Sequence, residues 1–103
     1  MIVKFGVATN DLEEAQMWVA AAIGLPAEPR ESSDWGGDYY GYSGADGEEL
    51  RLISNRDIYD DGPIVGGCDE WKIVLTAEIE SSASIVLKKL ESNGIRFVKL
   101  AAR

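Results

Sequence analysis

Paired carboxylates are the side chains of this sequence with the most obvious capacity for acid–base chemistry. In enzymes that work with two carboxyl groups, the two come from separate elements, and one is desolvated so that its pKa rises. The pairs here are sequence neighbours in polar, glycine-rich surroundings, so we interpret them as solvated surface residues. The four pairs are Glu13-Glu14, Glu48-Glu49, Asp60-Asp61 and Asp69-Glu70.

One acidic stretch has part of the spacing of a calcium-binding loop. Asp57 to Gly62 reads DIYDDG, which places aspartates at the first and fifth positions and glycine at the sixth. Tyr59 stands at the third position and Cys68 at the twelfth, where oxygen ligands are required. The sequence therefore predicts no metal site here.

Other reactive groups are scarce. The chain contains no histidine, which removes the usual general base, the commonest zinc ligand and every Ser-His or Cys-His nucleophile. Cys68 is the single cysteine and has no histidine to activate it. We therefore expect a protein that is not an enzyme and that uses no cofactor.

The segment from Arg30 to Tyr42 combines aromatic and acidic side chains. It reads RESSDWGGDYYGY, and tyrosine and tryptophan are common anchors of protein interfaces. Alternation along a strand would place Tyr39 on one face and Tyr40 and Tyr42 on the other, and the sequence leaves open which face is exposed. The residues expected to bind a partner are Glu31, Asp34, Trp35, Asp38, Tyr39, Tyr40, Tyr42, Asp57, Tyr59, Asp60, Asp61, Asp69 and Glu70.

The charge of the chain narrows the class of partner. Ten basic and 18 acidic residues give a net charge of −8, and the pI is near 4.4. Residues 28–70 alone contain twelve acidic and three basic residues. Nucleic acid and anionic membranes are poor partners for such a chain, because both require a basic face. We expect a partner with a basic surface.

Length and composition predict one domain over residues 1–103. A chain of this length has room for a single hydrophobic core. It has one cysteine, no secretion leader at Met1 and no apolar run near the roughly 20 residues that span a bilayer. These features favour a cytoplasmic protein.

Hydrophobic patterning predicts a strand and a helix at the start of the chain. Ile2 to Ala8 is short and rich in β-branched residues, as buried strands are. In the helix that follows, Asn10 is the expected cap, with Glu13 as its capping-box partner. Gly24 is the expected end of this helix.

A hairpin is predicted in the middle of the chain. Asp38 to Ser43 and Glu48 to Ser54 form its strands, and Asp46-Gly47 suits the turn. The next segment, Asn55 to Asp69, is expected to be an irregular loop. The residues expected to face the core are Leu50 and Leu52, and those expected on the other face are Glu49, Arg51 and Ile53.

The last third of the chain predicts a strand, a helix and a strand. Trp71 to Ala77 has the alternation of a strand, Ser81 or Ser82 can cap the helix, and Gly94 can end it. Ile95 to Leu100 is the expected last strand. In the strand from Trp71 to Ala77, the residues expected on one face are Trp71, Ile73, Leu75 and Ala77.

This order of elements predicts an α+β fold, with a mixed sheet of about five strands and two helices on one face. The order fits a ferredoxin-like sandwich. It also resembles the βαβββ module of the glyoxalase, bleomycin-resistance and dioxygenase (VOC) family. Members of that family hold a metal through histidine and glutamate pairs, and this chain has no histidine to supply them.

The string ESSDWGGDYYGY, followed by EELRLISNRD, resembles a group of small bacterial immunity proteins over about Arg30 to Asp57. The resemblance implies that the protein neutralises a cognate polymorphic toxin of the contact-dependent inhibition or Rhs type. Many such toxins are nucleases with basic substrate sites, and an acidic inhibitor can be steered to such a site at a high rate.

Two other functions stay open at this point. A small-molecule-binding module of the VOC type would line a cavity with Trp18, Trp35 and Trp71. A metal-free enzyme would work with carboxylates and tyrosines. A sheet edge at Asp38 to Ser43 or at Ile95 to Leu100 would also permit a homodimer.

Overall fold

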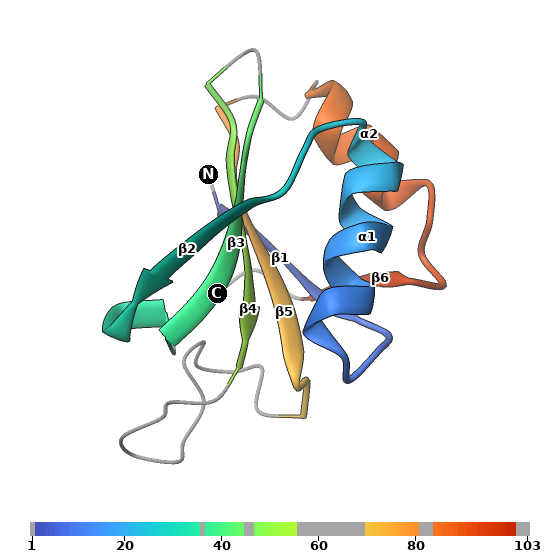
Figure 1. The fold of residues 1–103 in the computed structure, drawn as a ribbon. Helices are drawn as coiled ribbons and strands as arrows, with labels where there is room; N and C mark the ends of the chain where they lie inside the picture. Colours follow the sequence, from blue (N-terminus) through green and yellow to red (C-terminus); the bar gives the residue numbers. More distant parts are fainter. Residues whose placement is uncertain (1, 36, 45–46, 56–69, 81–83, 101–103) are drawn as a thin grey trace.

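The described residues form one sheet of six strands with two α-helices on one side of it (Figure 1). The computed structural model describes residues 2–35, 37–44, 47–55, 70–80 and 84–100, except for the side chain of Ser33. In chain order the elements are β1 (Ile2–Val7), α1 (Leu12–Ile23), β2 (Glu28–Ser32), the 3-10 helix η1 (Ser33–Trp35), β3 (Gly37–Ser43), β4 (Glu49–Ser54), β5 (Ile73–Glu78), α2 (Ile85–Glu91) and β6 (Phe97–Lys99).

The sheet has the strand order β2-β3-β4-β5-β1-β6, and each neighbouring pair is antiparallel. The predicted α+β class, with both helices on one face, is confirmed. The sheet has six strands rather than about five and is antiparallel rather than mixed. Without β2 and β3, the elements follow the βαββαβ order of the ferredoxin-like motif. The pair β2 and β3 therefore extends that motif at one edge.

The main hydrophobic core lies between the helices and the sheet. Alternate strand residues enter it, as the period of two requires, and the predicted inward direction of Leu50 and Leu52 is confirmed. From α1 the buried side chains follow helical spacing at Ala15, Val19 and Ile23. Those from α2 are Val86, Leu87 and Leu90.

Three of the four α-helix ends differ from the predictions by one to three residues. Asp11, not Asn10, caps α1, because its carboxylate accepts hydrogen bonds from the backbone N–H groups of Glu13 and Glu14. The predicted end at Gly24 is confirmed, and its φ of 71° is a left-handed conformation that suits glycine. The cap of α2 is Ser84, whereas the predicted Ser81 and Ser82 lie outside the described residues. The C-cap of α2 is Ser92 and not Gly94.

Trp71 lies on the opposite side of the sheet from the one predicted. Strand β5 begins at Ile73, so Trp71 precedes the strand and its side chain does not follow the alternation of the strand between the two faces. Its ring covers Gly6 of β1 on the face away from the helices. Ile73, Leu75 and Ala77 do face the main core, as predicted.

Two strands also differ from the predictions. The sequence does not predict β2 as a separate strand, because Glu28–Ser32 is polar and contains Pro29. The last strand is confined to Phe97–Lys99, and Ile95, expected within it, is 88% exposed in the preceding turn. Gly47 has the positive φ expected of the hairpin turn. Asp46 and residues 56–69, most of the predicted loop, lie outside the described residues.

A second, smaller hydrophobic cluster covers part of the face away from the helices, which we call the open face. Tyr39, Ile53 and Val74 are its buried members. The partly buried residues packed against it are Trp35, Trp71 and Leu100. The open face therefore has its own apolar cover.

We predict that Gly6→Ala destabilises the fold by about 1–3 kcal/mol, because a Cβ at Gly6 would lie 2.1 Å from Cδ2 of Trp71 and displace the ring. Urea unfolding followed by tryptophan fluorescence measures this change. Gly94→Ala is the matched control, since a Cβ there meets no atom within 4 Å. Equal stability of the two variants would contradict the packing of Trp71 on β1.

Candidate functional site

Two acidic residues face each other at the edge of the sheet. Glu31 of β2 is the direct cross-strand partner of Asp38 of β3, and both are exposed. Like charges in directly opposite positions destabilise a sheet. Among the described residues, neither carboxylate has an ion pair with a cation. This pair is therefore an arrangement that the fold alone does not favour.

The register brings these two side chains especially close. Pro29 stands opposite Tyr40, and since proline has no N–H, this pair cannot exchange two hydrogen bonds across the strands. The pair two positions along, Glu31 and Asp38, is of the same non-hydrogen-bonded kind. At such positions the Cα atoms approach to about 4.5 Å and the side chains are closest.

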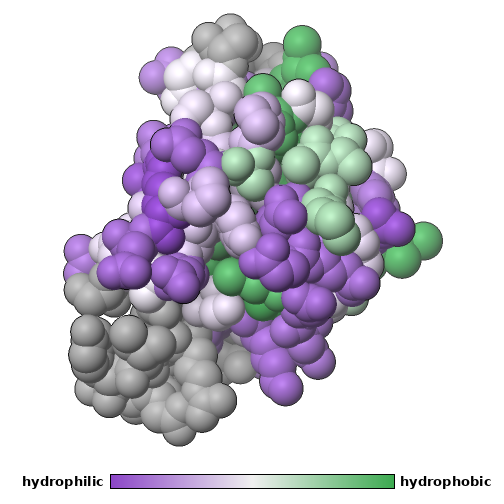
Figure 2. Space-filling view, viewed as in Figure 1, coloured by the Kyte–Doolittle hydropathy of each residue, from purple (hydrophilic) through white to green (hydrophobic). Residues whose placement is uncertain are grey.

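Helix α1 adds an acidic residue beside this pair. The hydroxyl of Tyr40 donates a hydrogen bond to the carboxylate of Glu13 and so joins β3 to the first turn of α1. This bond raises the pKa of Tyr40, and the charge of Asp38 acts in the same direction. Figure 2 shows hydrophilic side chains gathered over β2 and over the N-terminal half of α1. We call Glu13, Glu31, Asp38 and Tyr40 the acidic surface.

The structure divides the predicted binding residues into three groups. Glu31, Asp34, Asp38 and Glu70 are exposed, and Tyr40 and Trp35 are half-buried. Tyr42 and Tyr39 are only 1% and 9% exposed, because β3 is covered on both faces. Neither tyrosine can therefore serve as an interface anchor in this structure. The other predicted residues, Asp57, Tyr59, Asp60, Asp61 and Asp69, lie outside the described residues.

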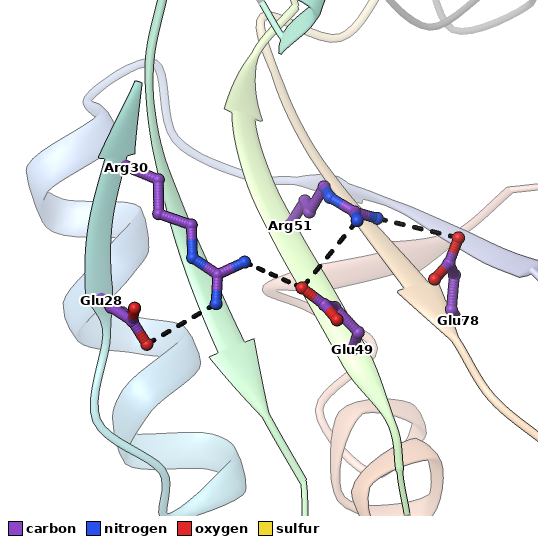
Figure 3. Close-up of polar contacts among 5 residues, drawn as sticks. All are labelled: Glu28, Arg30, Glu49, Arg51 and Glu78. Atoms are coloured by element: carbon purple, nitrogen blue, oxygen red, sulfur yellow. Dashed lines mark hydrogen bonds and ion pairs between the residues drawn. The ribbon is translucent and has the colours of Figure 1, made fainter. Parts of the chain in front are cut away.

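Some acidic side chains near β2 form ion pairs with arginines. On the open face, Arg30 Nη1 lies 2.8 Å from Glu49 Oε1, and Arg30 Nη2 lies 3.5 Å from Glu28 Oε2 (Figure 3). Arg51 lies 3.8 Å from Glu49 and 3.7 Å from Glu78. Positive and negative groups thus alternate across the sheet, and the two arginines offset most of the charge of the three glutamates.

A glycine permits this network. The guanidinium of Arg30 crosses β3 at Gly41, where a Cβ would lie 2.5 Å from its Cζ atom. Its hydrogen bond to Glu49 lowers the pKa of that carboxyl. The indole of Trp35 covers Arg51, with the guanidinium carbon 4.9 Å from the ring centroid. Trp35 is therefore held on the open face and not among the carboxylates of the acidic surface.

The three tryptophans do not line a common cavity. Trp18 packs against the main core on the helix side and stacks with Arg96 at 4.5 Å. Trp35 and Trp71 belong to the cluster on the open face. The sheet separates the two groups, which contradicts the tryptophan-lined cavity considered from the sequence.

Neither metal ligation nor membrane crossing is indicated by the described part of the chain. Within it, no group of three or more histidine, cysteine, aspartate or glutamate residues is arranged to hold a metal ion. Its two helices both lack the length and apolar composition that a bilayer crossing needs.

Sequence reasoning does not identify the contribution of Glu13 or the arginine network. The sequence indicates only a capping role for Glu13, and its contact with Tyr40 joins residues 27 positions apart. The network has a detectable signal, since Glu49 and Arg51 alternate with Leu50 and Leu52 and are predicted on the outer face. Comparison with protein-family models gives no match, and neither does comparison with the curated proteins.

We predict that Asp38→Asn stabilises the fold by a few tenths of a kcal/mol, because it removes the repulsion from Glu31. Thermal and urea unfolding at low and high salt measure the effect, which salt should reduce. Glu80→Gln is the control, as Glu80 is exposed and has no ion pair within the described residues. A loss of stability in Asp38→Asn alone would show that this carboxylate has a stabilising partner.

We predict that Glu49→Gln destabilises the fold at pH 7 by up to about 1 kcal/mol, the range of partly exposed ion pairs. A carboxyl whose pKa is lowered by folding stabilises the protein above its ordinary pKa and loses that contribution as the pH falls. The difference from the parent protein should therefore shrink between about pH 5 and about pH 2. A difference that is constant over this range would exclude the Arg30–Glu49 bond as its cause.

Proposed function

We propose that this protein is an immunity protein, which binds a basic bacterial toxin domain and neutralises it through the acidic surface. The observation that carries the proposal is the exposed pair of Glu31 and Asp38, which lie opposite each other without a cation among the described residues. A basic side chain of a partner would relieve this repulsion. Binding would then stabilise the β2–β3 edge of the inhibitor.

The electrostatics of the whole chain support the same type of partner. A net charge of −8 accelerates the encounter with a basic protein, most strongly at low salt. On the open face, Arg30 and Arg51 offset most of the charge of Glu28, Glu49 and Glu78. The field available to a partner in this region therefore comes mainly from the acidic surface.

Tyr40 is the best candidate for an aromatic anchor. It is half-buried against the main core, and its hydroxyl is bonded to Glu13. A ring fixed in this way loses little conformational entropy on binding, which is the property of residues that dominate interfaces. Tyr40 also stands two residues from Asp38 on the same face of β3, so one partner residue can contact both.

Inhibition of this kind requires no catalytic group. Carboxylates can occupy the positions that phosphates take in a nuclease site, and the bound inhibitor would exclude the substrate. The proposal agrees with the resemblance over Arg30 to Asp57, and it implies that the protein acts in the cytoplasm that the toxin enters.

The proposal predicts a near-equimolar basic partner whose binding depends on Glu31 and Asp38. The tagged protein is used to capture proteins from its native cytoplasm, and the captured chain is identified by mass spectrometry. That chain is then expressed alone and together with this protein in cells. Expression alone should stop growth, and co-expression should restore it.

Binding of the isolated pair tests the acidic surface itself. The double variant Glu31→Gln, Asp38→Asn should lower the association rate about tenfold at low salt and much less at high salt. The control Glu80→Gln removes a charge that lies after the C-terminal end of β5, near Gly47 in the turn between β3 and β4. This variant should bind like the parent. Equal rates for all three proteins at every salt concentration, or a captured chain that is harmless, would refute the proposal.

A further inference from the structure

The two edges of the sheet carry opposite charges. Strand β2 forms one edge and β6 the other, and the exposed carboxylate of Glu31 projects from the first. Lys99 projects from the second, next to Arg96 in the preceding turn. Helix α2 packs against β6 and adds Lys88 and Lys89 in its last turn. The described chain therefore has an acidic edge and a basic edge.

The hydrogen-bonding groups on the β2 edge are few and well defined. Arg30 pairs with Tyr39, and this pair exchanges the hydrogen bonds toward β3. The backbone groups of Pro29 and Glu31 therefore point away from the sheet. Proline has no N–H, so Glu31 is the residue of β2 whose N–H and C=O both point outward, with no backbone partner in the described part of the chain.

One residue of β6 also has both of its backbone hydrogen-bonding groups directed away from the sheet. The N–H of Leu100 donates to Lys4 and the C=O of Arg96 accepts from Ala8, so alternate residues along this edge bond to β1. Phe97 and Lys99 then point outward. The N–H of Phe97 already donates to Asn93 in the turn. Lys99 is therefore the residue of β6 whose outward N–H and C=O have no backbone partner among the described residues.

We propose that this protein associates with a second copy of itself head to tail, by antiparallel pairing of the β2 edge of one copy with the β6 edge of the next. Glu31 and Lys99 are the central pair and exchange two backbone hydrogen bonds. Strands β2 and β6 run in opposite directions within the sheet. A neighbour in the same orientation therefore continues the antiparallel sheet.

The side chains of the central pair complement each other. Glu31 lies on the helix side of the sheet, the side of Tyr40, because it is opposite Asp38. Lys99 lies on the helix side as well, because it stands two residues from buried Phe97 and its Nζ is 2.9 Å from Glu91 of α2. Direct partners in a sheet share a face, so the ammonium of Lys99 would lie beside Glu31 and offset its repulsion from Asp38.

The same charges disfavour the symmetric alternatives. Pairing of β2 with β2 around this position opposes Glu31 to Glu31, and pairing of β6 with β6 opposes Lys99 to Lys99. Like charges in these positions destabilise a sheet. A head-to-tail contact leaves one edge free at each end of the assembly, so growth does not stop at a dimer unless a ring closes. This inference does not rest on the proposed toxin inhibition.

Charge reversal at one edge at a time tests the contact. Sedimentation equilibrium of the full chain, from micromolar to millimolar concentration, should show an average mass that rises past the dimer. Glu31→Lys and Lys99→Glu should each weaken association about tenfold, because an attractive cross-strand pair becomes a repulsive one. Glu80→Gln should associate like the parent protein.

An equimolar mixture of the two reversal variants is the decisive sample. At one contact in the mixture, the lysine introduced into β2 of one variant would face the glutamate introduced into β6 of the other, and the parental pair would form at the next contact. Association should therefore return to the parental strength, which also shows that both variants are folded. In the parent protein, hydrogen exchange of the Glu31 and Lys99 amides should slow as concentration rises. A monomeric mass at all concentrations, or no recovery in the mixture, would overturn the proposal.

Discussion

An antiparallel sheet can leave one face to water, but this sheet has apolar residues on both faces and helices on only one, so side chains must cover the second apolar face. Most of this structure follows from that constraint. Trp71 covers Gly6, and Arg30 crosses Gly41 to reach Glu49. Each large group lies where the strand beneath it has no side chain. The residues between them, such as Ile53 and Val74, are fully buried although neither described α-helix covers them. The open face thus has a small second hydrophobic core with ion pairs beside it.

This constraint also explains how the acidic charge is distributed. Residues of β2 alternate between the two faces, so Glu28 meets the arginines on the open face while Glu31 does not. The formal charge of residues 28–70, counted along the sequence, combines carboxylates with quite different surroundings. Only those outside the arginine network keep the field that a basic partner can use. The acidic surface is accordingly smaller than the composition implies.

Local patterns in the sequence are sufficient to predict the strands with a clear alternation. Leu50 and Leu52 face the core and Arg51 faces away, as the period of two requires. The same reasoning places Trp71 wrongly, because the ordered alternation starts only at Ile73. The tyrosines of β3 have no predictable phase, because each face of that strand has a buried tyrosine, Tyr39 on one and Tyr42 on the other.

Long-range contacts account for most of the candidate site that could not be predicted. The pair of Glu31 and Asp38 depends on β2, which the sequence does not predict because the segment is polar and contains Pro29. It also depends on the register that β2 adopts beside β3. The contact between Glu13 and Tyr40 depends on how α1 lies over the sheet. No spacing within one segment carries this information.

Strand β2 is the part of the sheet that is least secured by apolar contacts. None of its described residues belongs to either hydrophobic cluster, and it is attached through its ladder to β3 and through Arg30. Elements held in this way open at a lower free energy than the core. Opening of β2 would leave a five-stranded sheet that keeps the ferredoxin-like strands β4-β5-β1-β6 intact. A ligand that binds Glu31 would need β2 to be paired with β3, so its binding would also favour the paired state of this strand.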